Sequence, residues 1–270
     1  MSTIGIIAGR GIYPRTFIDA AKAQSTPPKL VIAGFHGETD PKLADEVEAM
    51  DWFRVGQLGK LIKFFKKQGV ENAIMVGQIT PSNLYQLRPD LRTLVVLAKL
   101  KQRNAESMFG AIADELAKDG IELLPATTFL EDLLPGEGLI AGPKPKQADL
   151  DDAQYAFDIA KKTSELDIGQ CAIVRRGTVL AVEAFEGTND CIKRAGELGR
   201  HKQLSLAKVS KPNQDFRFDV PVIGPDTIRN AADAGVQTIA IEANRTLLLG
   251  KDELLALCNE RKLSLLAING

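Results

Sequence analysis

The first eleven residues constrain the fold most strongly, because a short apolar run ends abruptly in glycines. Ile4 to Ala8 is apolar, and Gly9-Arg10-Gly11 follows it directly. This pattern predicts a strand and a tight turn, followed by a helix over residues 15–24. A strand that leads through glycines into a helix is the first step of an alternating α/β chain, so we expect the alternation to continue.

The N-terminal half repeats this alternation. Leu58, Leu61, Ile62 and Phe65 are spaced to share one helical face, which ends at Gly69. Strands are predicted at residues 30–35, 73–76 and 121–124, and further helices at residues 91–101 and 106–118. Strands alternating with helices of about 10 to 15 residues indicate a parallel sheet covered by helices. We therefore predict an α/β fold with a Rossmann-like N-terminal domain at residues 1–134.

A proline- and glycine-rich segment follows this domain. Residues 135–145 contain three prolines and three glycines, a composition through which neither a helix nor a strand is expected to run. We predict a hinge at residues 135–148 and a C-terminal α/β catalytic domain at residues 149–270. Hairpin-like strand pairs, such as the one turning at Arg175-Arg176-Gly177, predict a mixed sheet in this second domain.

Composition excludes several classes of function. Lys and Arg total 34 against 35 Asp and Glu, a net charge of −1, so no global positive field favours a nucleic-acid partner. The longest apolar stretches, such as Leu94 to Ala98, are too short to span a bilayer. The chain begins without signal-peptide features, and its three cysteines are scattered. We expect a cytoplasmic protein.

The turn Gly9-Arg10-Gly11 is the first candidate site. Glycines after a strand let backbone amides and a helix N-terminus approach a phosphate. The dinucleotide fingerprint is incomplete, because Pro14 replaces its third glycine and the second strand ends in Phe35-His36 without an acid. Three alternatives stay open: a phosphate or nucleotide site, an NAD(P)-dependent oxidoreductase, and a purely structural turn.

Three carboxylates form a second candidate site. Glu183, Glu186 and Asp190 lie within eight residues, and Mg²⁺ takes oxygen ligands that it shares with substrate phosphates. Gly187 permits a sharp turn, and Thr188 is a candidate helix N-cap whose hydroxyl can meet a phosphate. The alternative is an ordinary capped helix with a solvated acidic face.

A third candidate site is the charged tract from Lys208 to Thr227. Charged residues alternate here without a helical or strand period, namely Lys208, Lys211, Asp215, Arg217 and Asp219. Pro225 at the first position of a helix predicts free amides at Asp226 and Thr227 that can bind an anion. Phosphoryl chemistry needs such positioning and charge neutralisation, whereas the alternative is a charged surface loop.

Five segments taken together indicate a family. They are Gly5-Ile-Ile-Ala-Gly-Arg-Gly-Ile-Tyr-Pro14, Gly77-Gln-Ile-Thr-Pro81, Leu166-Asp-Ile-Gly-Gln170, Val179-Leu-Ala-Val-Glu-Ala-Phe-Glu-Gly-Thr188 and Phe216-Arg-Phe-Asp-Val-Pro-Val-Ile-Gly224. With these motifs in this order over nearly its whole length, the chain resembles the LpxI-type UDP-2,3-diacylglucosamine pyrophosphatases of lipid A biosynthesis.

The resemblance implies hydrolysis of the substrate diphosphate to UMP and 2,3-diacylglucosamine 1-phosphate (lipid X), with a divalent cation such as Mg²⁺. It also implies two linked domains with the lipid product between them. The family's essential aspartate corresponds to Asp219, as a metal ligand or the group that activates water. Glu186 and Asp190 are the further metal candidates. The predicted substrate-binding residues are Gly9, Arg10, Gly11, Gln170, Gly187, Thr188, Lys208, Lys211, Arg217 and Thr227.

One departure from the family pattern leaves a role open. The family often carries Gly-Asp-Asp where this chain has Asn104-Ala105-Glu106, so the role of Glu106 is undetermined. A lipid-nucleotide substrate implies transient contact with the inner membrane surface, and a symmetric homo-oligomer is the default assembly. The rival hypotheses are an NAD(P)-dependent oxidoreductase and a non-catalytic nucleotide- or lipid-binding protein, for which Asp219→Asn would change nothing.

Overall fold

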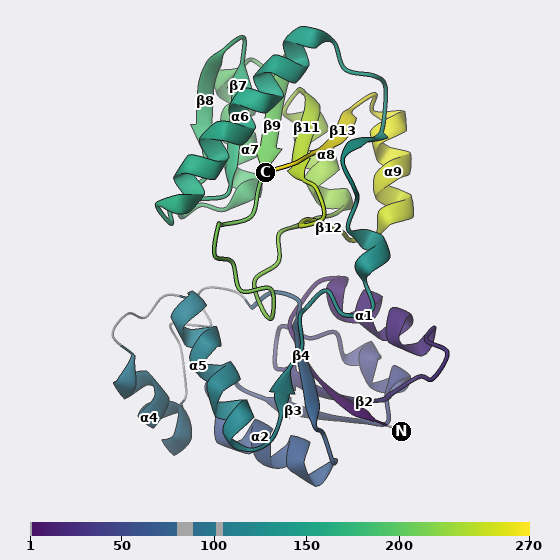
Figure 1. Ribbon diagram of the computed structural model, residues 1–270, viewed down its shortest axis with the longest axis vertical. Coiled ribbons are helices and arrows are strands. Elements are labelled where there is room, and N and C mark those ends of the chain that lie inside the picture. Colours follow the sequence, from purple (N-terminus) through teal and green to yellow (C-terminus); the bar gives the residue numbers. More distant parts are fainter. Residues whose placement is uncertain (1, 80–88, 101–104) are drawn as a thin grey trace. The chain divides into compact units, whose positions relative to one another are not determined.

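The computed structural model describes residues 2–79, 89–100 and 105–270 (Figure 1). The chain forms two compact units. Unit 1 comprises Met1–Leu130 together with Asp215–Asp219, and unit 2 comprises Glu131–Gln214 together with Val220–Gly270. The chain therefore leaves unit 2 after Gln214, adds a short segment to unit 1, and returns. The predicted domain limits do not include this excursion.

Unit 1 is built on a parallel sheet of five strands in the order β3-β2-β1-β4-β5. The strands are β1 (Thr3–Ala8), β2 (Lys29–Phe35), β3 (Ala49–Phe53), β4 (Asn72–Val76) and β5 (Glu122–Leu123). The order reverses between β1 and β4, as in doubly wound α/β folds. The predicted α/β fold with a Rossmann-like parallel sheet is confirmed.

The helices of unit 1 cover the sheet with apolar faces. They are α1 (Tyr13–Lys22), η1 (Pro41–Glu46), α2 (Leu58–Lys67), α4 (Leu91–Lys99) and α5 (Ala105–Lys118). Helices α2, α4 and α5 share one core cluster with β2 and β4, in which Phe65 and Leu116 are fully buried. Gly5 makes room on this face, because a Cβ there would lie 2.8 Å from the Phe65 ring.

Strand β3 was not predicted. Its sequence, Ala-Met-Asp-Trp-Phe, mixes polar and apolar residues because it forms an edge of the sheet. Trp52 stacks on His36 with ring centroids 5.5 Å apart, which accounts for this tryptophan as a packing residue. Three residues named in the sequence motifs, Thr80, Pro81 and Asn104, lie outside the described residues.

Unit 2 contains a mixed sheet of six strands in the order β6-β13-β11-β9-β7-β8. The strands are β6 (Gly138–Ala141), β7 (Cys171–Arg175), β8 (Thr178–Val182), β9 (Leu204–Lys208), β11 (Val236–Glu242) and β13 (Ser264–Ile268). Strands β9, β11 and β13 run parallel to one another. Strand β6 pairs antiparallel with β13, and β7 pairs antiparallel with both β8 and β9. The predicted mixed sheet and the β7–β8 hairpin are confirmed. Two short strands, β10 (Val222–Ile223) and β12 (Leu247–Leu248), pair separately.

Strand β6 corrects one expectation, because it lies inside the proline- and glycine-rich segment. The four residues Gly138-Leu-Ile-Ala141 between the prolines are free of proline and pair with β13 at the edge of the sheet. An edge strand needs hydrogen bonds on one side only, so it tolerates prolines close to its ends.

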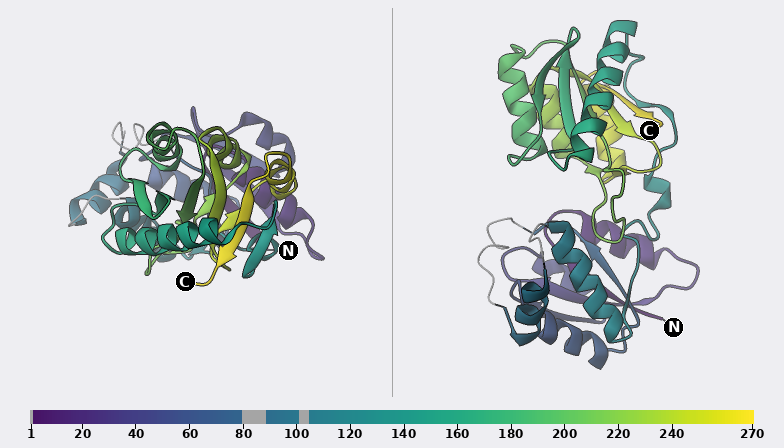
Figure 2. Two further views of the ribbon diagram at one scale, coloured as in Figure 1. Left: turned by 90° about the horizontal axis from the view of Figure 1, so that it is seen from above. Right: turned by 60° about the vertical axis from the view of Figure 1, so that its left-hand side comes forward.

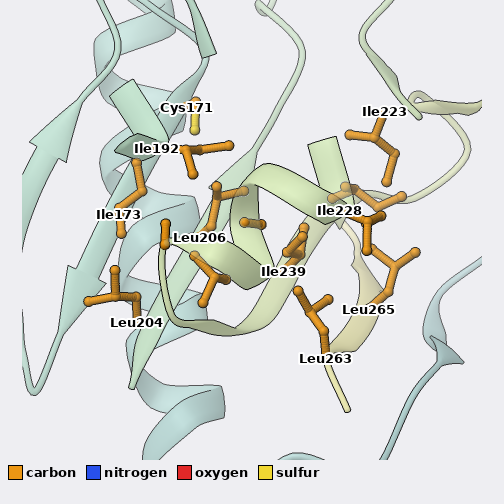
Figure 3. Close-up of a cluster of buried hydrophobic side chains, with 14 of the residues drawn as sticks. Cys171, Ile173, Ile192, Leu204, Leu206, Ile223, Ile228, Ile239, Leu263 and Leu265 are labelled. Atoms are coloured by element: carbon orange, nitrogen blue, oxygen red, sulfur yellow. The ribbon is translucent and has the colours of Figure 1, made fainter. Parts of the chain in front are cut away.

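The helices of unit 2 cover both faces of this sheet (Figure 2). They are α6 (Gln147–Glu165), α7 (Thr188–Leu198), α8 (Pro225–Asp233) and α9 (Lys251–Glu260), and the short helix η2 (Glu131–Leu133) precedes β6. Helix α6 packs its alanines and Phe157 on Ala172 and Ala207. Helices α7, α8 and α9 pack on the other face, where Ile192 and Ile228 meet Leu206 and Ile239 (Figure 3). None of the described helices is long and apolar enough to cross a membrane.

Candidate functional site

The segment Asp215–Asp219 of unit 1 forms a tight turn around one carboxylate. Asp215 accepts hydrogen bonds from Arg217 Nε at 3.0 Å and Nη2 at 2.6 Å, and its backbone oxygen accepts from the amide of Asp219 at 2.9 Å. The hydrogen bonds from Arg217 lower the pKa of Asp215, and the same contact raises the pKa of Arg217. Asp219 is half-buried at the end of this turn.

Two contacts fix this segment on the body of unit 1. The amide of Ala126 donates to the backbone oxygen of Phe216 at 2.8 Å. The ring of Phe218 packs against Phe109 of α5 with centroids 5.7 Å apart. The position of Asp219 therefore depends on the apolar residue directly before it, and Phe109 was not predicted as a site residue.

The turn Gly9-Arg10-Gly11 meets the loop after β4. The amide of Gly9 donates to Val76 O at 2.8 Å, and Arg10 forms an antiparallel backbone bridge with Gln78. Only glycine fits at position 9, because the Cβ of any other residue would lie 2.4 Å from Gln78 O. This corrects part of the phosphate prediction: the amides of Gly9 and Arg10 already donate to backbone oxygens, so they are not free to bind an anion. The exposed Arg10 side chain and Gly11 stay candidate groups for a phosphate at this turn.

A polar pocket of about 290 Å³ in unit 2 brings together predicted residues from three separate segments. Its lining includes Gln170, Thr188, Lys208 and Lys211, and these four are the predicted binding residues that it unites. Lys208 Nζ donates to Val222 O at 3.0 Å, and Lys211 forms an ion pair with Asp167. The lining also includes the carboxylates of Asp167 and Glu183, so a phosphate bound here would compete with them for the two ammonium groups.

The pocket also contains Glu183, whose neighbours differ from those predicted. Thr188 Oγ1 donates to Glu183 Oε1 at 2.9 Å, and the amide of Gln170 donates to Glu183 Oε2 at 3.3 Å. Thr188 is not the N-cap of α7. Gly187 occupies that position with φ at +83°, a conformation that favours glycine, and Thr188 is the first helical residue. Its hydroxyl is therefore used by Glu183 and not by the helix end.

The acidic residues of this region do not converge on one point. Glu186 pairs with Arg194, and that hydrogen bond lowers the pKa of Glu186. Asp190 pairs with Lys193 at 3.1 Å, and both side chains are exposed. In the part of the chain that the structure describes, no three His, Cys, Asp or Glu side chains are grouped so that they could hold a metal ion.

The predicted anion site at the start of α8, made of the amides of Asp226 and Thr227, is corrected at Thr227. The amide of Thr227 donates to Gly224 O at 3.0 Å, so it is not free. The first turn of the helix closes on Gly224, which adopts an extended conformation as the N-cap. Pro225 does stand at the start of the helix, as predicted.

One buried network beside the pocket was not predicted. Glu242 at the end of β11 accepts from Ser210 N at 2.8 Å, Ser210 Oγ at 2.7 Å and Lys161 Nζ at 3.0 Å. Burial by itself would raise the pKa of Glu242, but the hydrogen bonds from Ser210 and the Lys161 ammonium outweigh it and lower the pKa. Because Ser210 lies between Lys208 and Lys211, this network fixes the segment that carries both lysines. A charged residue ending the apolar run Ile239-Ala-Ile was the available signal.

Comparison with known proteins agrees with the motifs. The model of the LpxI N-terminal domain matches residues 3–133, and the model of the LpxI C-terminal domain matches residues 136–266. UDP-2,3-diacylglucosamine pyrophosphatase LpxI of Caulobacter vibrioides is 31% identical over 279 residues, covering 100% of this chain and 98% of the relative. The chain belongs to the LpxI family.

The LpxI motifs quoted from the sequence lie at the features described above. Gly9-Arg10-Gly11 and Gly77-Gln78 form the paired loops of unit 1. Gln170 and Thr188 line the polar pocket of unit 2. The Phe216–Gly224 motif begins in unit 1, where it carries Asp219, and ends in unit 2. Glu106 is an exposed residue in the first turn of α5, and its role in this member of the LpxI family stays open.

Proposed function

We propose that this protein hydrolyses the diphosphate of UDP-2,3-diacylglucosamine, giving UMP and 2,3-diacylglucosamine 1-phosphate. The observation that carries the proposal is the match of both LpxI domains, in order, over nearly the whole chain. A relative of this similarity and coverage is named for this substrate. The matched domains and relative are not named for either rival, an NAD(P)-dependent oxidoreductase or a non-catalytic nucleotide- or lipid-binding protein.

Asp219 is the proposed catalytic residue. It ends the turn that Arg217 and Asp215 build, so a carboxylate and a guanidinium lie close along the chain. In the proposed reaction a water oxygen bonds to phosphorus as the bridging P–O bond breaks. The water proton passes to a base, for which Asp219 is the candidate unless it holds a metal instead. Arg217 keeps a 41% exposed side chain through which it can neutralise phosphate charge.

The polar pocket of unit 2 is the proposed site for a charged part of the substrate. Lys208 and Lys211 supply two positive charges, and Gln170 and Thr188 supply hydrogen-bonding groups. Arg10 and Gly11 in unit 1, and Gly187 and Thr227 in unit 2, remain proposed binding residues on sequence grounds. The backbone amides of Arg10 and Thr227 already donate to Gln78 O and Gly224 O, so these two residues would bind through other groups.

A divalent cation such as Mg²⁺ is the proposed cofactor. The described carboxylates form no group that would hold a cation by themselves. Mg²⁺ is usually bound through one or two carboxylates together with substrate phosphates, so a larger protein cluster is not required. The cation would offset the charge of the diphosphate, and Asp219 is the candidate ligand.

Because the proposed substrate is a lipid, we also propose transient contact with the cytoplasmic surface of the inner membrane. A symmetric homo-oligomer is the expected assembly. Co-sedimentation with vesicles and the mass of the protein in solution test these two points separately.

The experiment that tests the function measures UMP release from UDP-2,3-diacylglucosamine, with Mg²⁺ and with EDTA. Wild type should release UMP only with the metal, and Asp219→Asn should lose at least about a hundredfold in rate with its fold intact. Asp233→Asn is the control, since Asp233 is a 69% exposed partner of Arg261. Absence of UMP release from folded wild type in every condition would overturn the proposal.

A further inference from the structure

Unit 1 contains an apolar pocket of about 100 Å³ that the proposed chemistry does not yet use. Ile7 of β1 and Met75 of β4 lie on its sheet side, and Leu61, Leu97 and Ile112 contribute from α2, α4 and α5. It therefore adjoins the two strands between which the strand order reverses. Ligands of open α/β sheets bind at such switch points.

The mostly apolar lining disfavours polar ligands. Gln57 and Thr93 contribute polar side chains, and the carbonyl oxygen of Gln57 and the hydroxyl of Thr93 are both used within the chain. Gln57 Oε1 accepts from the amide of Arg54 at 3.0 Å, and the hydroxyl of Thr93 bonds to Gly56 O at 2.6 Å. A sugar, a base or a phosphate would lose its hydrogen bonds to water here without replacing them. Apolar cavities of this kind stay dry and accept hydrocarbon.

Two lining residues connect the pocket to the proposed site. Phe109 lines it and packs on Phe218, the residue before Asp219. Ile79 also lines it and directly follows Gln78, whose backbone pairs with Arg10. A ligand whose head lies near Arg10 or Asp219 can therefore place an apolar chain in this pocket.

We propose that this pocket of unit 1 binds the distal methylenes of one fatty acyl chain of the lipid substrate and thereby selects acyl-chain length. The inference rests on the proposed function for the identity of the lipid, and on the described lining for its hydrocarbon character. Each further methylene buried should tighten binding about fourfold until the pocket is full.

The first arm of the test measures hydrocarbon binding without catalysis. The probe is cis-parinaric acid, a fatty acid whose own hydrocarbon chain is fluorescent and carries no polar group at its distal end. Leu97→Trp and Ile112→Phe fill the pocket from α4 and α5, and each should weaken probe binding at least about tenfold. Leu94→Trp is the matched control, because Leu94 lies on the same helix, is 49% exposed and is not part of the lining. Its affinity should stay within about twofold of wild type.

The second arm measures UMP release from substrates with long and short acyl chains. The filled variants should reduce the ratio of kcat/KM for long over short chains at least about tenfold, with the short-chain rate nearly unchanged. Circular dichroism checks folding, and Ile112→Phe carries the test if Leu97→Trp does not fold.

The outcomes separate this inference from the function. Absence of probe binding to wild type, or equal binding by wild type and both filled variants, would overturn the acyl site. The expected binding pattern without UMP release from any substrate would overturn the proposed function and leave a hydrocarbon site of unit 1.

Discussion

The backbones of Arg10 and Gln78 form an antiparallel pair, with Arg10 N donating to Gln78 O at 2.8 Å and Gln78 N donating to Arg10 O at 3.1 Å. The pair joins the loops that follow β1 and β4. Gly9 and Gly77 stand beside it, and a Cβ on Gly77 would lie 2.8 Å from Arg10 O. The close approach of the two loops therefore depends on the absence of a side chain at both positions.

Substitution of Gly9 by alanine tests this approach. Because the new methyl group would meet backbone atoms that cannot rotate away, Gly9→Ala should lower the free energy of unfolding by about 1–3 kcal/mol. It should also reduce UMP release. Gly110→Ala in α5 is the control, since a Cβ at that position would have nothing within 4 Å. That variant should be slightly more stable than wild type. Urea unfolding measures both, and equal stability of the two variants would refute the explanation.

Removal of a pocket lysine tests the polar pocket of unit 2. Lys208→Ala should lower kcat/KM about 10- to 100-fold, because a charged hydrogen bond to substrate is worth about 1.5–3 kcal/mol. Steady-state UMP release measures the effect. Lys202→Ala, at an exposed position that does not line the pocket, should match wild type. A wild-type rate for Lys208→Ala would remove the pocket from the proposed site.

Magnesium titration separates the candidate metal ligands. Glu186 and Asp190 are engaged with Arg194 and Lys193, so Glu186→Gln and Asp190→Asn should leave the Mg²⁺ concentration for half-maximal activity within about twofold. Asp219→Asn should abolish activation at every concentration. If Glu186→Gln or Asp190→Asn needed much more Mg²⁺ for half-maximal activity, the sequence prediction that these two acids bind the metal would be supported instead.

The buried network predicts a pH dependence of stability. Because the folded pKa of Glu242 lies below its ordinary value of 4.5, its contribution is complete above pH 4.5 and is lost as pH falls through the lowered pKa. At neutral pH Glu242→Gln should lose about 3 kcal/mol, since Lys161 is left without its buried partner. The difference between wild type and Glu242→Gln should shrink on acidification.

A surface pair provides the comparison for that experiment. Glu253→Gln removes a carboxylate that pairs with Arg229 and is 57% exposed, so it should cost less than about 1 kcal/mol at any pH. Unfolding followed by circular dichroism from pH 3 to 7 gives both curves. A difference between wild type and Glu242→Gln that does not change with pH would contradict the assigned cause.

The fold was largely predictable because most strands are buried and apolar. Strands such as β1 and β2 are continuous apolar runs after their first residue, and α2 shows its apolar face in the spacing from Leu58 to Phe65. Strand β3 has no such signal, since Asp51 is exposed at the sheet edge. Strand β6 depends on pairing with β13, more than a hundred residues later, which local composition does not express.

The site was predictable in its residue types and less so in its hydrogen bonds. Gln170, Thr188, Lys208 and Lys211 were predicted from separate segments and line one pocket. The amide of Thr227 was predicted to be free, but it closes the first turn on Gly224. Which donors remain available depends on backbone geometry, and the sequence pattern does not specify that geometry.

The excursion of residues 215–219 has a consequence for the order of synthesis. Phe216 and Phe218 reach Ala126 and Phe109 only after most of unit 2 has left the ribosome. Unit 1, whose synthesis begins first, is therefore completed late. A nascent chain ending at Leu130 would lack Phe218, the aromatic neighbour of Phe109. Separate expression of the N-terminal region would yield an unfinished unit without Asp219.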